Sequence, residues 1–326
     1  MNLHRTYPIA GGILVAIFLL VIPQTLPILL IHLSTEILYF ALFAVSFNLV
    51  FGYGGLLPFG HAALFGIGAY TAGLLFNHLP QLSILPILLI AALSGLVAGF
   101  LIGLFCVRLS GPYFSLASLA FQMFFFAVAL KWRSVTHGSD GMGITRPGLY
   151  LPLLGSLPMG EVQNLYYITL VLVALGIFTC YFFLKTPLGN SVVCMRENEI
   201  RASFLGYDIF LTKITVLAVS GMLAGLAGGL FALFQGFVST TCIDVNMSLI
   251  VLLMVVIGGT DYFLGPVIGA AFYLIFQDWL SGMTRHWWLF MGIFFVFVVL
   301  YLEGGIIELF KFGKIRLWIS KSGNKT

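Results

Sequence analysis

Long apolar runs without charge are the feature that most constrains how this chain folds. The stretch 84–107 holds no charged residue, and 212–236 holds only Lys213. A helix needs roughly 20 apolar residues to cross a bilayer. The whole sequence is 60% hydrophobic and 8% charged, whereas soluble domains carry about 25% charged residues. The sequence therefore predicts an all-α, polytopic bundle of transmembrane helices, forming a single transmembrane domain over residues 1–326.

About ten membrane spans are expected from the positions of these apolar runs. They lie at 8–30, 36–51, 61–76, 84–107, 113–130, 164–184, 212–236, 247–258, 263–280 and 287–303. Three of them, 36–51, 61–76 and 247–258, are short, and glycines lie within them or at their ends. The first run has no small-residue cleavage site, so we predict a retained helix and not a signal peptide.

The basic residues predict the orientation of the spans. With the N-terminus inside, eleven of the 15 Lys and Arg residues fall on the cytoplasmic side, as the positive-inside rule requires. An even span count places the C-terminus inside as well. This topology defines a cytoplasmic loop at 185–212, an outer loop at 131–163 and a basic cytoplasmic tail at 304–326.

The cytoplasmic loop carries the densest charge in the chain and predicts one short amphipathic helix. Thr186 followed by Pro187 is typical of a helix start, and Gly206 of a helix end. The residues of interest are Arg196, Glu197, Asn198, Glu199, Ile200, Arg201, Phe204 and Leu205. Such a helix either rests on lipid headgroups or contacts a protein. Two glutamates disfavour anionic lipid and favour a protein partner.

Two glycine-rich segments predict breaks in spanning helices. Irregular backbone at membrane depth persists only where it is buried in protein or lines a wet cavity, and transporters use such breaks to handle polar substrates. The alternative is an ordinary tight loop. Both breaks precede a small-residue helix, which suggests an internal repeat. The candidate pathway residues are Gly52, Gly54, Gly55, Pro58, Gly60, His61, Tyr70, Gly258 and Gly259.

Other glycines recur at every fourth position and predict close helix packing. They are Gly95, Gly99 and Gly103 in one span, and Gly221, Gly225 and Gly229 in another. None forms a phosphate-binding loop, because no Lys-Ser or Lys-Thr follows.

Ionisable residues within the membrane are sparse and are expected at span ends. They are Glu36, His61, Asp244, Asp261 and Asp278. An ion-driven carrier usually needs such a group inside a span, so this pattern indicates that energy comes from elsewhere. His61 is more typical of a hydrogen-bonded structural group than of a proton relay.

Enzymatic signatures are not found in the sequence. No cluster has metal-ligand spacing, no nucleophile elbow occurs, and basic residues do not interleave with aromatics as in nucleic-acid binders. The four cysteines are scattered and predict small buried residues. We therefore expect no enzyme activity, cofactor or metal and no nucleic-acid partner, with membrane lipid as the surroundings.

Several motifs in order resemble those of LivM-type permease subunits of ABC importers for branched-chain amino acids. They are Gly52–Gly55 with Gly60–Ala63, Gly66–Thr71, Gly111–Phe114 with Leu119–Phe121, Thr136–Met142, Pro187–Gly189, Arg196–Glu199 with Leu205–Gly206, Leu252–Gly259 and Gly265–Ala270. Pro58 and Pro112 stand where the family often has other residues.

The resemblance implies a permease in a bacterial inner membrane that moves branched-chain, hydrophobic amino acids. It implies a second, LivH-type permease subunit, two cytoplasmic ABC ATPases that hydrolyse ATP, and a periplasmic binding protein. It also implies that Arg196–Leu205 is the coupling helix that inserts into an ATPase. A permease for urea or short amides is the nearest alternative. An ion-coupled secondary carrier or channel is a further one, and a purely structural scaffold fits least.

Overall fold

The computed structural model describes residues 20, 23–24, 27–79, 81–145, 149–151, 155–157, 161–301 and 304–308. Most of the predicted first span, 8–30, and residues 309–326 of the predicted tail lie outside this part of the chain.

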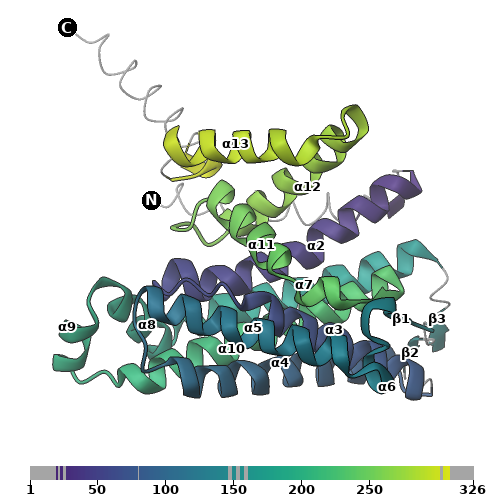
Figure 1. Ribbon diagram of the computed structural model, residues 1–326. Helices are drawn as coiled ribbons and strands as arrows, with labels where there is room; N and C mark the ends of the chain where they lie inside the picture. The colour runs from purple at the N-terminus through teal and green to yellow at the C-terminus, as the bar shows by residue number, and fades with distance from the viewer. Residues whose placement is uncertain are drawn as a thin grey trace, which may run out of the picture.

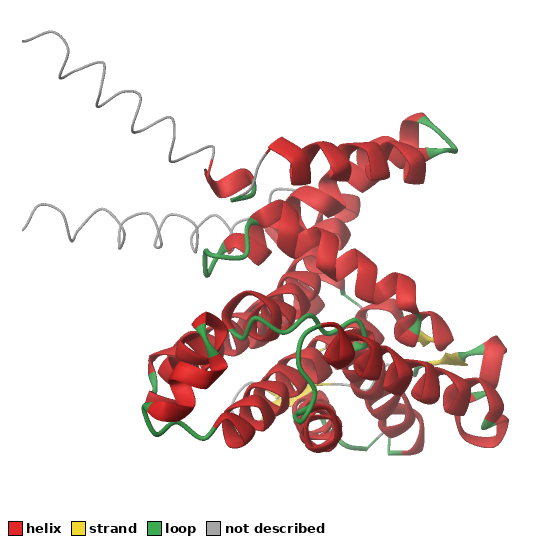
Figure 2. Cartoon of the chain, turned by 60° about the vertical axis from the view of Figure 1, so that its left-hand side comes forward, coloured by secondary structure: helices red, strands yellow, loops and turns green. Residues whose placement is uncertain are grey.

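Helices dominate the described residues, and the strands are short and sit in loops (Figure 2). The helices are α2 (Ile28–Asn48), α3 (His61–His78), α4 (Ile84–Cys106), α5 (Pro112–Lys131), α6 (Arg133–Thr136), α7 (Val162–Lys185), α8 (Pro187–Glu197), α9 (Glu199–Phe204), α10 (Ile209–Gln235), α11 (Val245–Gly258), α12 (Gly265–Met283) and α13 (Trp287–Tyr301). A π-helical turn, η1 (Leu49–Tyr53), extends α2, and 3-10 turns form η2 (Gly138–Asp140) and η3 (Thr240–Ile243).

Within the described residues, four short strands form two antiparallel pairs. Strand β1 (Met142–Gly143) pairs with β4 (Phe237–Val238), with Met142 opposite Val238. Strand β2 (Leu149–Leu151) pairs with β3 (Gly155–Leu157), with Tyr150 opposite Ser156. The β1–β4 pair ties the predicted outer loop to the end of α10.

Five described helices are long and apolar enough to cross a membrane. They are Ile28–Tyr53, Ile84–Cys106, Pro112–Lys131, Val162–Lys185 and Ile209–Gln235. Shorter apolar helices lie at Val245–Gly258 and Trp287–Tyr301. The chain is therefore a polytopic helical membrane protein, as predicted, while the count of about ten spans stays a prediction.

The predicted glycine packing is confirmed at the contact between α4 and α10. A Cβ on Gly95 would lie 2.8 Å from the Cα of Gly225, and one on Gly225 would lie 2.6 Å from the carbonyl oxygen of Ala91. Neither position has room for a side chain. Small residues let the two backbones touch, which is how helices associate in lipid without a hydrophobic driving force.

The predicted boundary between the first two spans is wrong. A loop was expected at 31–35, yet α2 runs unbroken from Ile28, directly after the extended Pro27. The hydroxyls of Ser34 and Thr35 donate to the carbonyls of Leu30 and Ile31, both at 2.7 Å. Because these polar groups are satisfied within the helix, they do not end it. Glu36 consequently lies well inside a span and not at its end.

Helix α11 is short because the chain folds back into the bundle before the helix begins. Helix α10 ends at Gly236, whose φ of 66° is left-handed, and β4 follows. Turn η3 then packs against α3 and α5. Gln122, in the middle of α5, donates through Nε2 to the carbonyl of Ile243 at 2.7 Å. Asp244 therefore begins α11 at mid-bundle depth, which corrects its predicted position at a span end.

The two predicted loops occupy opposite ends of the bundle. Helices α8 and α9 lie at one end, whereas α6 and the strands β1, β2 and β3 lie at the other (Figure 1). Helices α3, α4, α5, α7 and α10 run between these ends, and α11–α13 stack to one side (Figure 1).

Candidate functional site

The charged loop folds into two helices and not the single one predicted. Thr186 caps α8 by accepting a hydrogen bond from the Gly189 amide at 3.2 Å, and Pro187 is the first helical residue. Asn198 is extended, with φ −167°, and its side chain accepts from the Arg201 amide at 3.0 Å to cap α9. An asparagine that caps a new helix cannot also continue the old one. The predicted end at Gly206 fits its left-handed φ of 88°.

Two ion pairs attach the α8–α9 segment (residues 187–205) to the bundle. Arg196 at the end of α8 pairs with Asp261 at 2.9 Å. Glu199 at the start of α9 pairs with Lys213 of α10 at 2.9 Å, and the Lys213 side chain is only 3% exposed. Both pairs fix the inner side of the segment.

The opposite side of the segment is apolar and projects from the bundle. Ile200, Phe204 and Leu205 are 67%, 85% and 74% exposed. Glu197 and Arg201 flank them, also exposed, and neither forms an ion pair with any residue that the structure describes. Large apolar side chains framed by free charges are typical of a surface that a protein partner covers.

The first glycine break joins α2 to α3 at the same end of the bundle. The helix loosens into the π-helical η1, Gly55 turns the chain with φ 68°, and α3 begins at His61. A Cβ on Gly55 would lie 3.2 Å from Cγ of Arg196. The break is therefore packed directly against α8.

The second glycine break, between α11 and α12, meets the first. Gly259 has φ 104°, and the Asn48 side chain donates to the Thr260 carbonyl at 3.2 Å. Gly52 is also closed in between Asn48 and Thr260. Arg196 contacts both breaks, because it packs on Gly55 and pairs with Asp261. We name this contact of α8 with the two breaks the inner junction.

His61 is a buried structural residue. It is 1% exposed, its Nε2 lies 2.9 Å from the Ser46 hydroxyl, and Phe43 and Phe47 flank its ring, each at 5.4 Å between ring centroids. Ser220 of α10 donates to the Ser46 carbonyl at 2.7 Å. This chain of contacts ties α2, α3 and α10 together, and fits the structural interpretation of His61.

The remaining predicted pathway residues occupy different surroundings. Gly54 and Pro58 are buried within the first break, Gly60 packs against Ser118 of α5, and Gly258 packs against Gly265. Tyr70 is buried in α3 at 6% exposure. A cavity of about 390 Å³ opens beside the first break and α5, lined by Gly55, Leu57, Phe59, Gly111, Pro112, Ser115 and Leu116. The pathway assignment of these residues stays a prediction.

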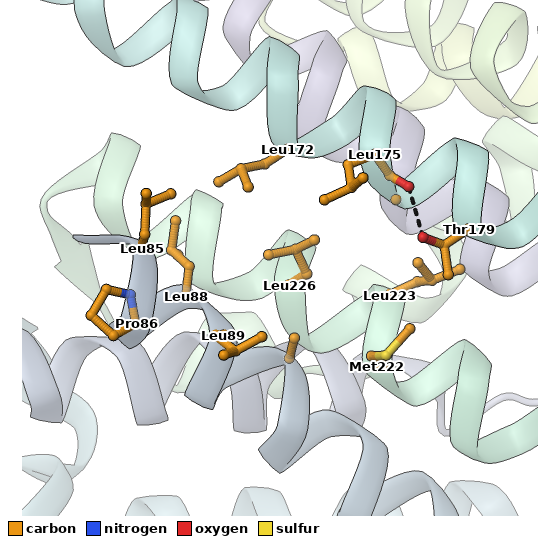
Figure 3. A pocket seen from close by; sticks show the side chains of 12 residues that line it. Leu85, Pro86, Leu88, Leu89, Leu172, Leu175, Thr179, Met222, Leu223 and Leu226 are labelled. Carbon is orange, nitrogen blue, oxygen red and sulfur yellow. Dashed lines mark hydrogen bonds between the residues drawn. The ribbon is translucent and has the colours of Figure 1, made fainter. Parts of the chain in front are cut away.

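A second cavity, of about 560 Å³, lies between α4, α7 and α10 and is apolar (Figure 3). Leucines dominate its lining, and its one hydroxyl, Thr179, donates to the carbonyl of Leu175 in its own helix at 2.8 Å (Figure 3). No polar group of this lining is free to receive a solute, so this cavity suits hydrocarbon.

Several residues that organise the site were not assigned a role from the sequence. From the sequence, Asp261 and Lys213 could be noted only as charged residues. Their ion pairs join residues that are distant in the sequence, and such pairs leave no local pattern. A buried relay was missed too: the Ala62 amide donates to Ser248 at 3.0 Å, and Ser248 donates to Gln122 at 3.0 Å. The only sequence signal for this relay was that Ser248 and Gln122 are polar residues within apolar runs.

Fold and site together define an integral membrane protein with glycine-broken helices and a charged segment at one end. The chain matches the family described as the branched-chain amino acid transport system / permease component over residues 29–302, and it belongs to that family. It is thus a transport subunit, a permease component of an ABC transporter in the branched-chain amino acid family.

Curated relatives place the chain within this family. It is 29% identical to the high-affinity branched-chain amino acid transport system permease protein LivM of Salmonella typhimurium, over 86% of this chain and 70% of that protein. It is 23% identical to a probable LivM of Methanocaldococcus jannaschii, over 74% and 79% of the two chains. It is 27% identical to the guanosine ABC transporter permease protein NupQ of Bacillus subtilis, over 40% and 41%.

Proposed function

We propose that this chain is the LivM-type subunit of an ATP-driven importer that moves branched-chain, hydrophobic amino acids across a bacterial inner membrane. The family match over 29–302 carries the proposal. The likeness to LivM over 86% of the chain favours the substrate class. The chain would supply half of a gated pathway, and a periplasmic binding protein would select the solute.

The α8–α9 segment is the proposed contact with a cytoplasmic ATPase. Its exposed tip, Ile200, Phe204 and Leu205, suits a groove in a protein. Glu197 and Arg201 beside the tip can form charge pairs that fix the orientation of docking. Both side chains are exposed and available for this. The glutamates also disfavour anionic headgroups, the other interpretation of such a helix.

The inner junction offers a route from the ATPase to the membrane. When two ATPases close on ATP, they would displace α8, and Arg196 would move with it. Because Arg196 touches both Gly55 and Asp261, one displacement would reach both glycine breaks. The helices on either side would then rock between outward-open and inward-open arrangements.

The proposed assembly holds this chain, a LivH-type second permease, two ABC ATPases and the binding protein. The N- and C-termini and the α8–α9 segment would face the cytoplasm, and the strand end of the bundle the periplasm. The residues proposed to form the pathway are those of the two breaks together with His61 and Tyr70.

The double substitution Glu197→Ala and Arg201→Ala tests the coupling role. In the reconstituted complex it should lower ATP-dependent uptake of L-leucine about 10-fold, because each lost charge pair at a docking surface costs on the order of 1 kcal/mol or more. Basal ATPase activity should persist. The control, Glu197→Asp with Arg201→Lys, keeps both charges and should retain most uptake. Unchanged uptake in the alanine variant would contradict the assignment of the α8–α9 segment as the contact with the ATPase.

A different solute is the main alternative, whether urea, a short amide or a nucleoside. The likeness to a guanosine permease keeps this alternative open. The thermal shift of the purified partner binding protein decides between them. Stabilisation by leucine, isoleucine or valine supports the proposal, whereas stabilisation only by urea, an amide or guanosine replaces its substrate class.

A further inference from the structure

The apolar cavity between α4, α7 and α10 is a gap that these helices do not close. Helix α4 directs its glycines to α10, where a Cβ on Gly95 would lie 2.8 Å from the Cα of Gly225. Helix α7 directs its glycine to α2, where a Cβ on Gly176 would lie 2.7 Å from Cδ1 of Leu42. Membrane helices approach each other through such small residues. Because those of α4 and α7 serve other contacts, the two helices face each other across the cavity largely with leucines (Figure 3).

The cavity lies at membrane depth and its rim joins the outer surface of the bundle. All three helices that line it are long and apolar enough to cross a membrane. The rim residues Leu89 of α4 and Leu175 of α7 are 61% and 58% exposed. Their neighbours Leu93 and Val171, which lie outside the lining, are exposed as well. An apolar surface therefore runs from the cavity to the outside of the bundle, where the surrounding medium in a bilayer is hydrocarbon.

The chemistry of the lining selects the occupant. A space of about 560 Å³ is far larger than the voids that proteins leave empty, and apolar cavities exclude water but take up apolar molecules. The Thr179 hydroxyl is already bonded to the Leu175 carbonyl, so a polar solute would lose its hydration without any return. A helix of another subunit would meet bulky leucines and not small residues. A flexible hydrocarbon chain meets neither obstacle.

We propose that this cavity binds an acyl chain of a membrane phospholipid. The chain would enter at the strand end of the bundle, since Leu85 and Pro86 of the lining lie in the first turn of α4. The connection before α4 lies at that end, because Asn77 at the end of α3 donates to the Gly143 carbonyl of β1 at 2.8 Å. The acyl chain would replace the missing contact between the closely packed α4–α10 pair and α7, which continues through Thr186 into α8. The site does not depend on which solute is transported.

Photolabelling of the full complex tests the position. The purified complex is irradiated with a phospholipid that carries a diazirine in its acyl chain, and labelled residues are quantified by mass spectrometry. Leu89 and Leu175 should carry more label than Phe100, which is 43% exposed on α4 outside the lining. Ala92→Phe, within the lining, should lower the label at both leucines at least about 5-fold, because the added ring overpacks the space. Ala174→Phe is the matched control, since Ala174 is exposed on α7 outside the lining.

Two outcomes of the photolabelling would overturn the site. One is label at the two rim leucines no greater than at Phe100 in the native complex. The other is an equal loss of label in Ala92→Phe and Ala174→Phe.

Thermal stability gives a second test that a merely damaged variant cannot pass. The delipidated native complex should melt several degrees lower than the same complex with phospholipid restored, because an unfilled cavity is destabilising. Leu226→Trp, which places an indole in the cavity, should lose most of this lipid-dependent rise. Leu93→Trp adds the same ring outside the lining and should keep it. An equal rise in the two variants, or no rise in the native complex, would overturn the site.

Discussion

The α4–α10 contact and the inner junction are both rich in glycine, but they are built in opposite ways. Between α4 and α10, Gly95 and Gly225 sit inside regular helices and let two backbones touch. At the inner junction, Gly55 and Gly259 take left-handed backbone angles that end helices. The exposed ion pair of Arg196 with Asp261 then holds the junction together.

The difference indicates which part of the molecule is fixed and which can move. A contact of backbone on backbone has no alternative partner, so it suits a rigid unit. Exposed ion pairs are weak and exchange readily with water, so they can open and close without a large change in free energy. We infer that α4 and α10 move as one body and that movement is concentrated at the inner junction.

The largest effect is expected from filling the α4–α10 contact. Gly225→Leu should destabilise the chain by about 3 kcal/mol or more, because overpacking forces the two backbones apart. The purified complex should melt several degrees lower, or fail to assemble. Gly292→Leu is the matched control, since a Cβ at that helical position would meet no other part of the described chain within 4 Å. Equal melting temperatures for the two variants would show that the contact is not rigid.

A smaller effect is expected at the part-buried ion pair between Glu199 of α9 and Lys213 of α10. Glu199→Gln should leave the ammonium of Lys213 buried without its charge partner, at a cost of about 1–3 kcal/mol. The expected readout is faster proteolysis of the α8–α9 segment. Adding Lys213→Met to that variant should restore part of the resistance, because no buried charge then remains. If the double variant is cleaved as fast as the single one, the pair does not attach the segment.

The smallest change in stability is expected from the exposed ion pair. Arg196 and Asp261 are 40% and 61% exposed, so a double-mutant cycle should give a coupling of about 0.2–1 kcal/mol. Transport should respond more strongly than stability. Arg196→Ala should lower uptake per ATP hydrolysed, and Arg196→Asp with Asp261→Arg should recover part of it. If uptake per ATP hydrolysed changes among these variants only as much as their thermal stability does, Arg196 has no role in coupling.

The regular part of the fold could be predicted from the sequence because its signals are local. Apolar runs located α4, α5, α7 and α10 within a few residues, and fourth-residue glycines predicted the α4–α10 contact. Thr186 and Pro187 correctly predicted the start of α8. Each of these signals depends on neighbours a few positions away.

The errors arose where distant contacts override local patterns. Ser34 and Thr35 resembled a loop, but their hydroxyls bond within α2. Asn198 lay within a continuous amphipathic pattern, yet its side chain caps α9 and splits the helix. Asp244 was expected at a membrane surface, but η3 returns the chain into the bundle. That return depends on a hydrogen bond from Gln122 of another helix, which leaves no signal near Asp244 in the sequence. Because Glu36 and Asp244 lie inside the bundle, the scarcity of intramembrane charge no longer speaks against an ion-coupled carrier. Membership of the ABC permease family now speaks against that alternative.

ATP dependence of uptake tests the central claim most directly. The chain is purified with its co-eluting subunits, reconstituted into proteoliposomes with the binding protein, and supplied with L-leucine. The account predicts uptake that requires ATP, the binding protein and the ATPase subunits, and no uptake by this chain alone. Uptake by this chain alone, without ATP and driven by an ion gradient, would contradict it.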